Sequence, residues 1–100
     1  MPRTLWVYIM ASRGRRLYVG CTSDLCRRVW QHRTWYYVGH TSRYHINRLV
    51  WHESVGGRRA AVARERQLKG WLRRRKVALI ESLNAEWRDL AVDLGFEPID

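Results

Sequence analysis

One carboxylate of this 100-residue chain, Glu65, lies on a stripe of a predicted helix whose other residues are apolar. Residues 58–69 predict a helix that ends at Gly70, a residue common at helix C-termini. At helical spacing Glu65 falls on one stripe with three apolar residues, Ala61, Leu68 and Leu72. A carboxylate among apolar neighbours must be paired or bind a cation. Glu65 is therefore a candidate metal ligand. The alternative is an i, i+4 ion pair with Lys69, which contributes only about 0.3–0.5 kcal/mol.

Two tyrosines, Tyr8 and Tyr18, lie on neighbouring strands of a predicted β-hairpin within residues 5–20. With a turn centred on Arg13, Tyr8 pairs directly with Tyr18, and Gly20 leaves space beside the phenols. The opposite face of the hairpin is then aliphatic and consists of Val7, Ile9, Leu17 and Val19. The phenols are either ordinary sheet aromatics or part of a site.

Arg28 and His32 are four residues apart on the helix that follows the hairpin. Thr22 or Ser23 is expected to cap this helix, with Asp24 in its first turn, where the helix dipole favours a carboxylate. Each residue also has an ordinary explanation, because Arg28 can pair with Asp24 and a single helical histidine is more often structural or exposed than catalytic.

The charge of the chain is strongly basic and unevenly distributed. The formal net charge is +10, and residues 1–80 hold eighteen of the nineteen basic side chains but only three of the nine acids. Arginine greatly outnumbers lysine, which suits bidentate contacts with phosphate. These features predict a polyanionic partner, nucleic acid above all, whereas a merely solvated basic surface usually carries more acid and more lysine.

A run of four cations opens a helix predicted to extend to about Leu83. Positive charge in a first helical turn opposes the helix dipole at a cost of up to about 1 kcal/mol per charge. The run therefore points at something anionic, although it can also be merely solvated. The predicted contacts with nucleic acid are Arg27, Lys69, Arg73, Arg74, Arg75 and Lys76.

Length and hydropathy suit one small α+β domain that places these residues around one sheet. Residues 48–53 predict a third strand, expected to be central. Asn84 is expected to cap a last short helix over residues 86–94, ended by Gly95. The main domain, which carries the candidate site, is thus expected over 1–83, with an acidic helical extension over 84–100 packed on it.

Membrane insertion and secretion are not expected, because no apolar run approaches the roughly 20 residues that cross a bilayer and no signal-peptide core follows Met1. A cytoplasmic location is predicted. Cys21 and Cys26 suggest no disulfide framework, and the four histidines show no zinc-ligand spacing. Residues 34–46 are rich in aromatics without a clear period, so stacking on bases and covering the core are equally open.

The chain resembles the GIY-YIG nuclease superfamily, in particular its short, single-domain bacterial branch. The paired tripeptides of that family correspond to Val7-Tyr8-Ile9 and Tyr18-Val19-Gly20. Further matches are residues 24–28 with His32, the Arg64-Glu65 pair, and the Lys-Gly-Trp segment that follows. The resemblance covers nearly the whole chain and implies a three-stranded antiparallel sheet flanked by helices.

The resemblance also implies an activity, which is hydrolysis of a phosphodiester in DNA with one divalent ion, Mg²⁺ or Mn²⁺. It implies that Glu65 binds the metal and that Tyr8 acts as general base toward the attacking water. Arg28 corresponds to the arginine that steadies the phosphate, Tyr18 to a second active-site phenol, and His32 to a position held by His or Tyr. A protein partner for targeting is also possible.

The chain departs from the family pattern at two positions. Val7 replaces the first glycine, and in the predicted register it points toward the core, away from the site. Cys21 stands where some relatives have lysine, so a cationic helper is lost. Two functions follow as alternatives. One is a metal-dependent DNA endonuclease, with structure-selective or repair-linked cleavage as further options, and the other is a catalytically weak nucleic-acid-binding module that keeps the fold.

Overall fold

Three strands form one antiparallel sheet in the order β2-β1-β3 in the computed structural model, which describes residues 4–34 and 45–99. The strands are β1 (Leu5–Ala11), β2 (Leu17–Thr22) and β3 (Arg48–Val55). The central strand is β1, so the expectation that the third strand is central is wrong. The physical reason is that residues 7–11 are buried without a break, because both faces of β1 are covered.

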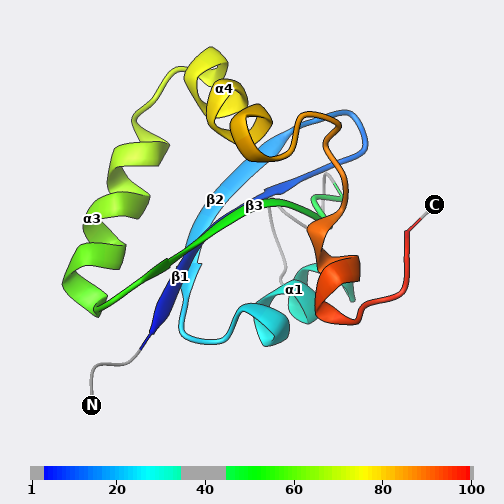
Figure 1. Ribbon diagram of the computed structural model, residues 1–100, viewed down its shortest axis with the longest axis horizontal. Coiled ribbons are helices and arrows are strands. Elements are labelled where there is room, and N and C mark those ends of the chain that lie inside the picture. Colours follow the sequence, from blue (N-terminus) through cyan, green and yellow to red (C-terminus); the bar gives the residue numbers. More distant parts are fainter. Residues whose placement is uncertain (1–3, 35–44, 100) are drawn as a thin grey trace.

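Helices cover both faces of the sheet, which confirms the predicted α+β architecture. On one face lie α3 (Arg58–Lys69) and α4 (Arg73–Leu83). On the other lie α1 (Leu25–Arg33) and the short 3₁₀ helix η1 (Leu90–Leu94) (Figure 1). The predicted bounds of α3 and α4 are confirmed.

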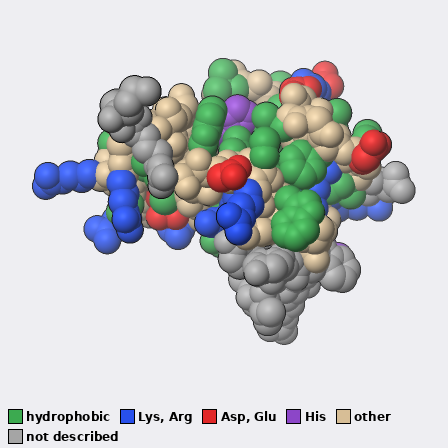
Figure 2. Space-filling view, turned by 90° about the horizontal axis from the view of Figure 1, so that it is seen from below, with side chains coloured by type: hydrophobic (Ala, Val, Ile, Leu, Met, Phe, Trp, Pro, Cys, Tyr) green, Lys and Arg blue, Asp and Glu red, His purple; other side chains and the backbone are tan. Residues whose placement is uncertain are grey.

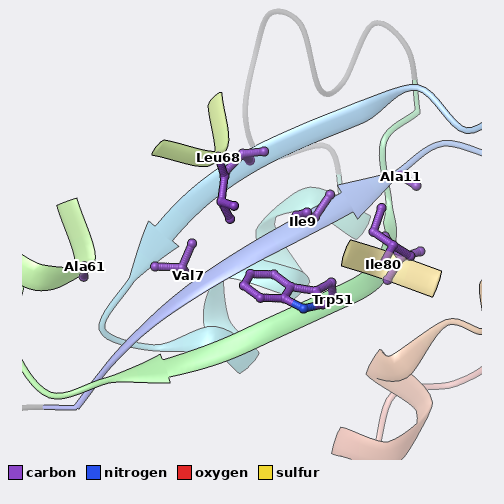
Figure 3. Packing of buried hydrophobic residues seen from close by; sticks show 9 residues of the cluster. Val7, Ile9, Ala11, Trp51, Ala61, Leu68 and Ile80 are labelled. Carbon is purple, nitrogen blue, oxygen red and sulfur yellow. The ribbon is translucent and has the colours of Figure 1, made fainter. Parts of the chain in front are cut away.

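The core under α3 and α4 is aliphatic apart from one tryptophan, and it seats α3 on the sheet. Figure 3 shows side chains of β1 and β3 meeting Leu68 of α3 and Ile80 of α4. The buried members are Val7, Ile9, Ala11, Val19, Val50, Trp51, Ala61, Leu68 and Ile80. Val7 thus points into this core, as predicted. Leu72, expected on the same stripe of α3, is instead 66% exposed because α3 ends before it.

The opposite face of the sheet, which carries the phenols, is a second core and not an open surface. Its buried members are Tyr8, Met10, Leu25, Val29, Ile46, Leu49 and Ala91. Tyr18 and Phe96 pack against it at the margin. The helix α1 reaches this core through Leu25 and Val29, which are four residues apart on one side of the helix.

The register of the hairpin differs from the predicted one by two residues. Tyr8 lies opposite Gly20, and Met10 lies opposite Tyr18. The turn closes at Ser12, whose backbone N–H donates to the Arg16 carbonyl at 2.9 Å. A shift of two residues keeps every side chain on its face, so the phenols remain on the same side of the sheet.

The cap of α1 also differs from the expectation. Asp24 itself is the N-cap, and its side chain accepts a hydrogen bond from the Arg27 backbone N–H at 3.0 Å. Thr22 precedes the cap and accepts from the Asp24 N–H at 3.1 Å. This arrangement fixes the start of α1 directly behind the end of β2.

The C-terminal segment packs against α1 and β3 through buried polar side chains. Asn84 is buried and donates to the Val50 carbonyl at 3.1 Å, so it does not cap a helix over 86–94 as predicted. The helix here is the shorter η1, capped by Asp89, which also pairs with Arg33 and accepts from the Leu49 N–H at 3.2 Å. The predicted stop at Gly95 is confirmed, with φ of 97°.

Two further expectations are not tested by the described residues. Most of the aromatic stretch predicted over 34–46 lies outside them, and the proposed boundary between 83 and 84 stays a prediction. Within the described ranges, no helix is long and apolar enough to cross a membrane. Cys21 and Cys26 are both free thiols.

Candidate active site

A tyrosine–histidine contact lies at the centre of the candidate site. The Tyr8 hydroxyl is 3.3 Å from Nε2 of His32, and both side chains are buried. The register of β1 and the position of His32 in the last turn of α1 produce this contact, because α1 packs across the Tyr8 face of the sheet. Two sequence-predicted residues are thereby brought together.

Gly20 is the residue that makes room for Tyr8. A Cβ built at position 20 would lie 2.5 Å from the Tyr8 hydroxyl oxygen and 2.7 Å from Cζ. Real side chains do not approach so closely, so the Tyr8 ring passes directly over the backbone of β2 only because residue 20 has no side chain. This is the space that the sequence predicted beside the phenols.

Tyr18 completes an aromatic group at this end of the sheet. Its ring centroid lies 6.3 Å from that of Tyr8 and 5.3 Å from the His32 imidazole. Tyr18 is half-buried, whereas Tyr8 is fully buried. The second phenol is therefore the one nearer to solvent.

His32 is held in its neutral form. Burial, followed by the positive charge of Arg28, lowers the pKa of His32 to about 4. A neutral imidazole has one ring nitrogen that accepts a hydrogen bond, so Nε2 can accept from the Tyr8 hydroxyl when Nδ1 carries the proton. Arg28 is half-buried on α1, one turn before His32.

Three charged candidates, Glu65, Arg28 and Lys69, act electrostatically on Cys21, which lies on the edge strand β2. Burial and the carboxylate of Glu65 raise the pKa of the Cys21 thiol, while Arg28, Lys69 and Arg58 oppose that rise. Residue 21 thus lies within electrostatic reach of α1 on one side and α3 on the other. The position that lacks the lysine of some relatives has cations of α3 beside it.

Glu65 is less buried than its apolar stripe suggests. Its side chain is 20% exposed, and Oε2 lies 3.4 Å from Nζ of Lys69. The ordinary i, i+4 pair is therefore present. In the part of the chain that the structure describes, no three His, Cys, Asp or Glu side chains cluster as a ready-made metal cage.

A small polar hollow lies beside the N-terminus of α1, next to the edge of the sheet. Its volume is about 180 Å³, and it is lined by Thr22, Ser23, Asp24, Arg27, Arg28 and Gln31. Figure 2 views the molecule from the α1 side, and Lys and Arg side chains gather on its left, toward α3. Of the predicted nucleic-acid contacts, Arg27 is at this hollow and Lys69 is beside Glu65.

The remaining predicted contacts lie apart from this group, on the first turn of α4. Arg73 and Arg74 are exposed, whereas Arg75 stacks over the Trp71 ring, 4.2 Å from its centroid. Sequence reasoning missed Arg58, whose charge acts on Cys21. The available signal was its spacing, since Arg58 precedes Glu65 by seven residues, two turns on the same side of α3.

Comparisons with known proteins show the family of the chain. Residues 4–78 match the family model of the GIY-YIG catalytic domain. A UPF0213 protein of Haloquadratum walsbyi is 35% identical over 80 residues, covering 76% of this chain and 85% of that protein. A UPF0213 protein of Bacillus pumilus is 28% identical over 81 residues, covering 81% of this chain and 83% of that protein.

A solved structure supports the fold as well. The solution NMR structure of a UPF0213 protein from Bacillus halodurans superposes with a TM-score of 0.56, covering 86% of this chain and 92% of that one at 24% identity. Together with the paired tripeptides on β1 and β2, these similarities identify the family. The chain belongs to the GIY-YIG family of nuclease-type catalytic domains.

Proposed function

We propose that the protein is a divalent-metal-dependent endonuclease that hydrolyses phosphodiester bonds in DNA. The observation that carries the proposal is the buried contact between Tyr8 and His32. The charge of Arg28 on α1 acts on both His32 and Cys21, and the carboxylate of Glu65 on α3 acts on Cys21 at the β2 edge of the sheet. Each of these groups except Cys21 has a chemical role in phosphodiester hydrolysis that its surroundings support.

The proposed metal ligand is Glu65, and the ion is Mg²⁺ or Mn²⁺. Because no three His, Cys, Asp or Glu side chains cluster among the described residues, a single carboxylate fits a hard ion that keeps several waters and completes its shell with phosphate oxygens. When bound, such an ion stabilises the negative charge that develops on the phosphate. Lys69, now paired with Glu65, would then be released toward the substrate.

The proposed general base is Tyr8, with His32 behind it. The Tyr8 oxygen takes a proton from the attacking water while its own hydroxyl proton passes to Nε2 of His32. The lowered pKa of His32, about 4, keeps this acceptor unprotonated at neutral pH. Burial of both side chains fixes their mutual orientation.

The proposed role of Arg28 is to bind the scissile phosphate. A guanidinium offers paired donors that match two phosphate oxygens, and it stays charged throughout the reaction. Its place beside the polar hollow leaves it accessible from solvent. In acyl-transfer enzymes, removing a single donor to a developing oxyanion costs about 10²–10³ in rate, which sets the scale for such charge stabilisation.

A second candidate function has one observation in its favour. The carboxylate of Glu65 already has a cationic partner in Lys69, so its position is explained without a metal. In that case the protein is a nucleic-acid-binding module that retains the fold and the basic surface but cleaves weakly. The two candidates differ in metal binding and in cleavage.

A nuclease assay with a metal titration separates the candidates. Single-stranded, duplex and branched DNA, with matched RNA, are incubated with the protein in Mg²⁺ or Mn²⁺, and metal binding is followed by calorimetry. We expect cleavage of at least one DNA and loss of both cleavage and metal binding in Glu65→Gln. The control is Glu53→Gln on β3, which removes a carboxylate that pairs with Arg64 at 3.2 Å.

Two results would decide against the enzyme. One is DNA binding by the wild-type protein without cleavage of any substrate in either metal. The other is a metal affinity that Glu65→Gln leaves unchanged. Cleavage of RNA alone would keep the hydrolase and correct the substrate.

A further inference from the structure

The turn between α3 and α4 presents an exposed leucine among cations. We call residues 69–75 the elbow; it lies at the upper margin of the molecule, where α3 and α4 meet (Figure 1). Leu72 is 66% exposed, although large aliphatic side chains are usually buried. Residue 72 is part of the connection between α3 and α4, and this connection does not depend on a leucine side chain.

The backbone of the elbow is held firmly. The Gly70 N–H donates to the Arg66 carbonyl at 3.1 Å, and the Trp71 N–H donates to the Leu68 carbonyl at 3.1 Å. The Leu72 carbonyl in turn accepts from the Arg75 N–H at 3.0 Å, which begins α4. Leu72 is therefore an apolar side chain on a fixed base and not the tip of a loose loop.

Trp71 adds to this rigidity from the side. Two guanidinium groups contact its ring, with Arg75 4.2 Å and Arg64 5.6 Å from the ring centroid. Arg64 is itself paired with Glu53 on β3. These contacts tie the elbow to both helices and the sheet, and they use the charge of Arg75 within the protein.

Arg73 and Arg74 are in a different situation. Both are exposed, and neither has a hydrogen bond or ion pair with any residue that the structure describes. No acidic residue occurs between Glu65 and Glu81 in the sequence. The elbow thus surrounds one exposed leucine with uncompensated positive charge.

The elbow is also close to the candidate site along α3. A helix rises about 1.5 Å per residue, so Lys69, at the start of the elbow, lies about 6 Å beyond Glu65 along the axis. The ion pair between Lys69 and Glu65 shows that the side chains at these two positions are in direct contact. A strand bound at the site is within reach of the elbow.

We propose that the elbow is a second nucleic-acid contact in which Arg73 and Arg74 bind backbone phosphates and Leu72 inserts between bases as a wedge. The inference rests on the proposed function for its partner, DNA. Apolar wedges flanked by basic residues unstack a base step at a cost of a few kcal/mol, which is smallest where pairing is already interrupted. The elbow therefore selects DNA with a branch, bulge or mismatch over continuous duplex.

The chain offers a matched control in Leu83, at the other end of α4. Leu83 is 78% exposed, so it is at least as accessible as Leu72. Its neighbours in sequence, Glu81 and Glu86, are acidic and would repel a phosphate backbone. Both leucine side chains are thus well exposed, and the two sites differ in the sign of the surrounding charge.

The test measures binding without cleavage. The wild-type protein, Leu72→Ser, Leu83→Ser and Arg73→Ala/Arg74→Ala are titrated in EDTA against bulged and continuous duplexes, with 2-aminopurine beside the bulge. We expect the wild type and Leu83→Ser to prefer the bulge about tenfold and to raise the 2-aminopurine fluorescence. Leu72→Ser should lose the preference and the fluorescence change while keeping its affinity for continuous duplex.

The double arginine variant should weaken binding to both DNAs and reduce the salt dependence by about one unit of slope per arginine. A preference that survives in Leu72→Ser, or that Leu83→Ser also loses, overturns the wedge. Because these measurements need no catalysis, a protein that cleaves DNA without a Leu72-dependent preference disproves only this inference. A Leu72-dependent preference in a protein that never cleaves supports the wedge and disproves only the endonuclease.

Discussion

The two halves of the candidate site are anchored in opposite ways. Tyr8 and His32 lie inside the core between the sheet and α1, where every neighbour restricts them. Glu65 and Lys69 lie on the partly exposed side of α3, where Lys69 is 51% exposed. The first half is therefore part of what folds the protein, whereas the second half rests on a helix that would fold equally well without it.

This difference separates stability from activity within one site. A buried hydroxyl or imidazole contributes to packing as well as to chemistry, so its substitution should change the free energy of unfolding. An exposed ion pair contributes little to stability, so its substitution should change only binding or catalysis. Four predictions test this contrast, ordered by their expected effect on the free energy of unfolding.

The largest effect is expected from pH acting on His32. Its pKa of about 4 in the folded protein lies below the ordinary value of 6.5, so the unfolded chain binds the extra proton first as pH falls. Stability is complete above pH 6.5 and is lost as pH drops toward 4, by about 3 kcal/mol for this group. Urea unfolding at several pH values should show this slope, and His32→Gln should flatten it. Equal slopes in both proteins would contradict the prediction.

Gly20→Ala should have the next largest effect. The new Cβ would lie 2.5 Å from the Tyr8 hydroxyl, which forces the ring or the strand to move. Overpacking of this kind costs about 1–3 kcal/mol, and we expect cleavage to fall with it. Thermal unfolding and the nuclease assay measure the two losses. Gly56→Ala is the control, because nothing lies within 4 Å of its new Cβ.

Tyr8→Phe should cost less stability and more activity. It removes the hydroxyl bonded to His32 at 3.3 Å but keeps the buried ring, so we expect a loss of about 1 kcal/mol. Loss of the general base should lower the cleavage rate about 10²-fold or more. Tyr18→Phe, half-buried and without that bond, should be nearly neutral in stability. A fully active Tyr8→Phe protein would remove Tyr8 from the proposed mechanism.

Glu65→Gln should have the smallest effect on stability and the greatest on activity. The exposed pair with Lys69 is worth no more than about 0.5 kcal/mol, so the unfolding midpoint should hardly move. Cleavage should disappear, since no other carboxylate is proposed to bind the metal. A loss of several kcal/mol would show that Glu65 is structural and would weaken the contrast between the two halves.

Much of the fold could be predicted from sequence because its signals are local. The stops at Gly70 and Gly95 and the apolar spacing of Leu25 and Val29 each depend on a few adjacent residues. The order of the strands was also readable, since residues 5–11 are apolar without a break, which is typical of a strand buried on both faces. The same residues also fit the alternating pattern of a hairpin with one exposed face, and that pattern favours β1 at an edge.

The hairpin register and the last helix depended on features that composition does not show. The observed pairing centres the turn on Gly14, one residue beyond the predicted centre at Arg13, and Arg15 within it has a φ of 66°, a conformation that glycine adopts far more easily. Asn84 is of a residue type that is common at helix N-caps. Its side-chain amide is instead buried against β3 and donates to the Val50 carbonyl, 34 residues earlier. Such a distant partner cannot be inferred from local pattern.

The site was predictable as a set of residues but not as a geometry. The tripeptides and the Glu65 stripe identify the groups, whereas the contact of Tyr8 with His32 depends on how α1 crosses the sheet. The burial of Tyr8 was also not foreseen, because the sequence gives no sign that a second core covers the phenols. Arg58 was missed because its own neighbours in sequence are equally basic.

The short connection between β1 and β2, over residues 12–16, has a consequence for the order of folding. A hairpin closed by so short a loop forms in about 1–10 μs, whereas β3 pairs with β1 only after a much longer segment closes. We therefore expect Tyr8 and Tyr18 to come together early in folding, and Glu65 to arrive last, when α3 docks on the completed sheet. A nascent chain would then hold its phenols in place well before the proposed metal ligand reaches its position.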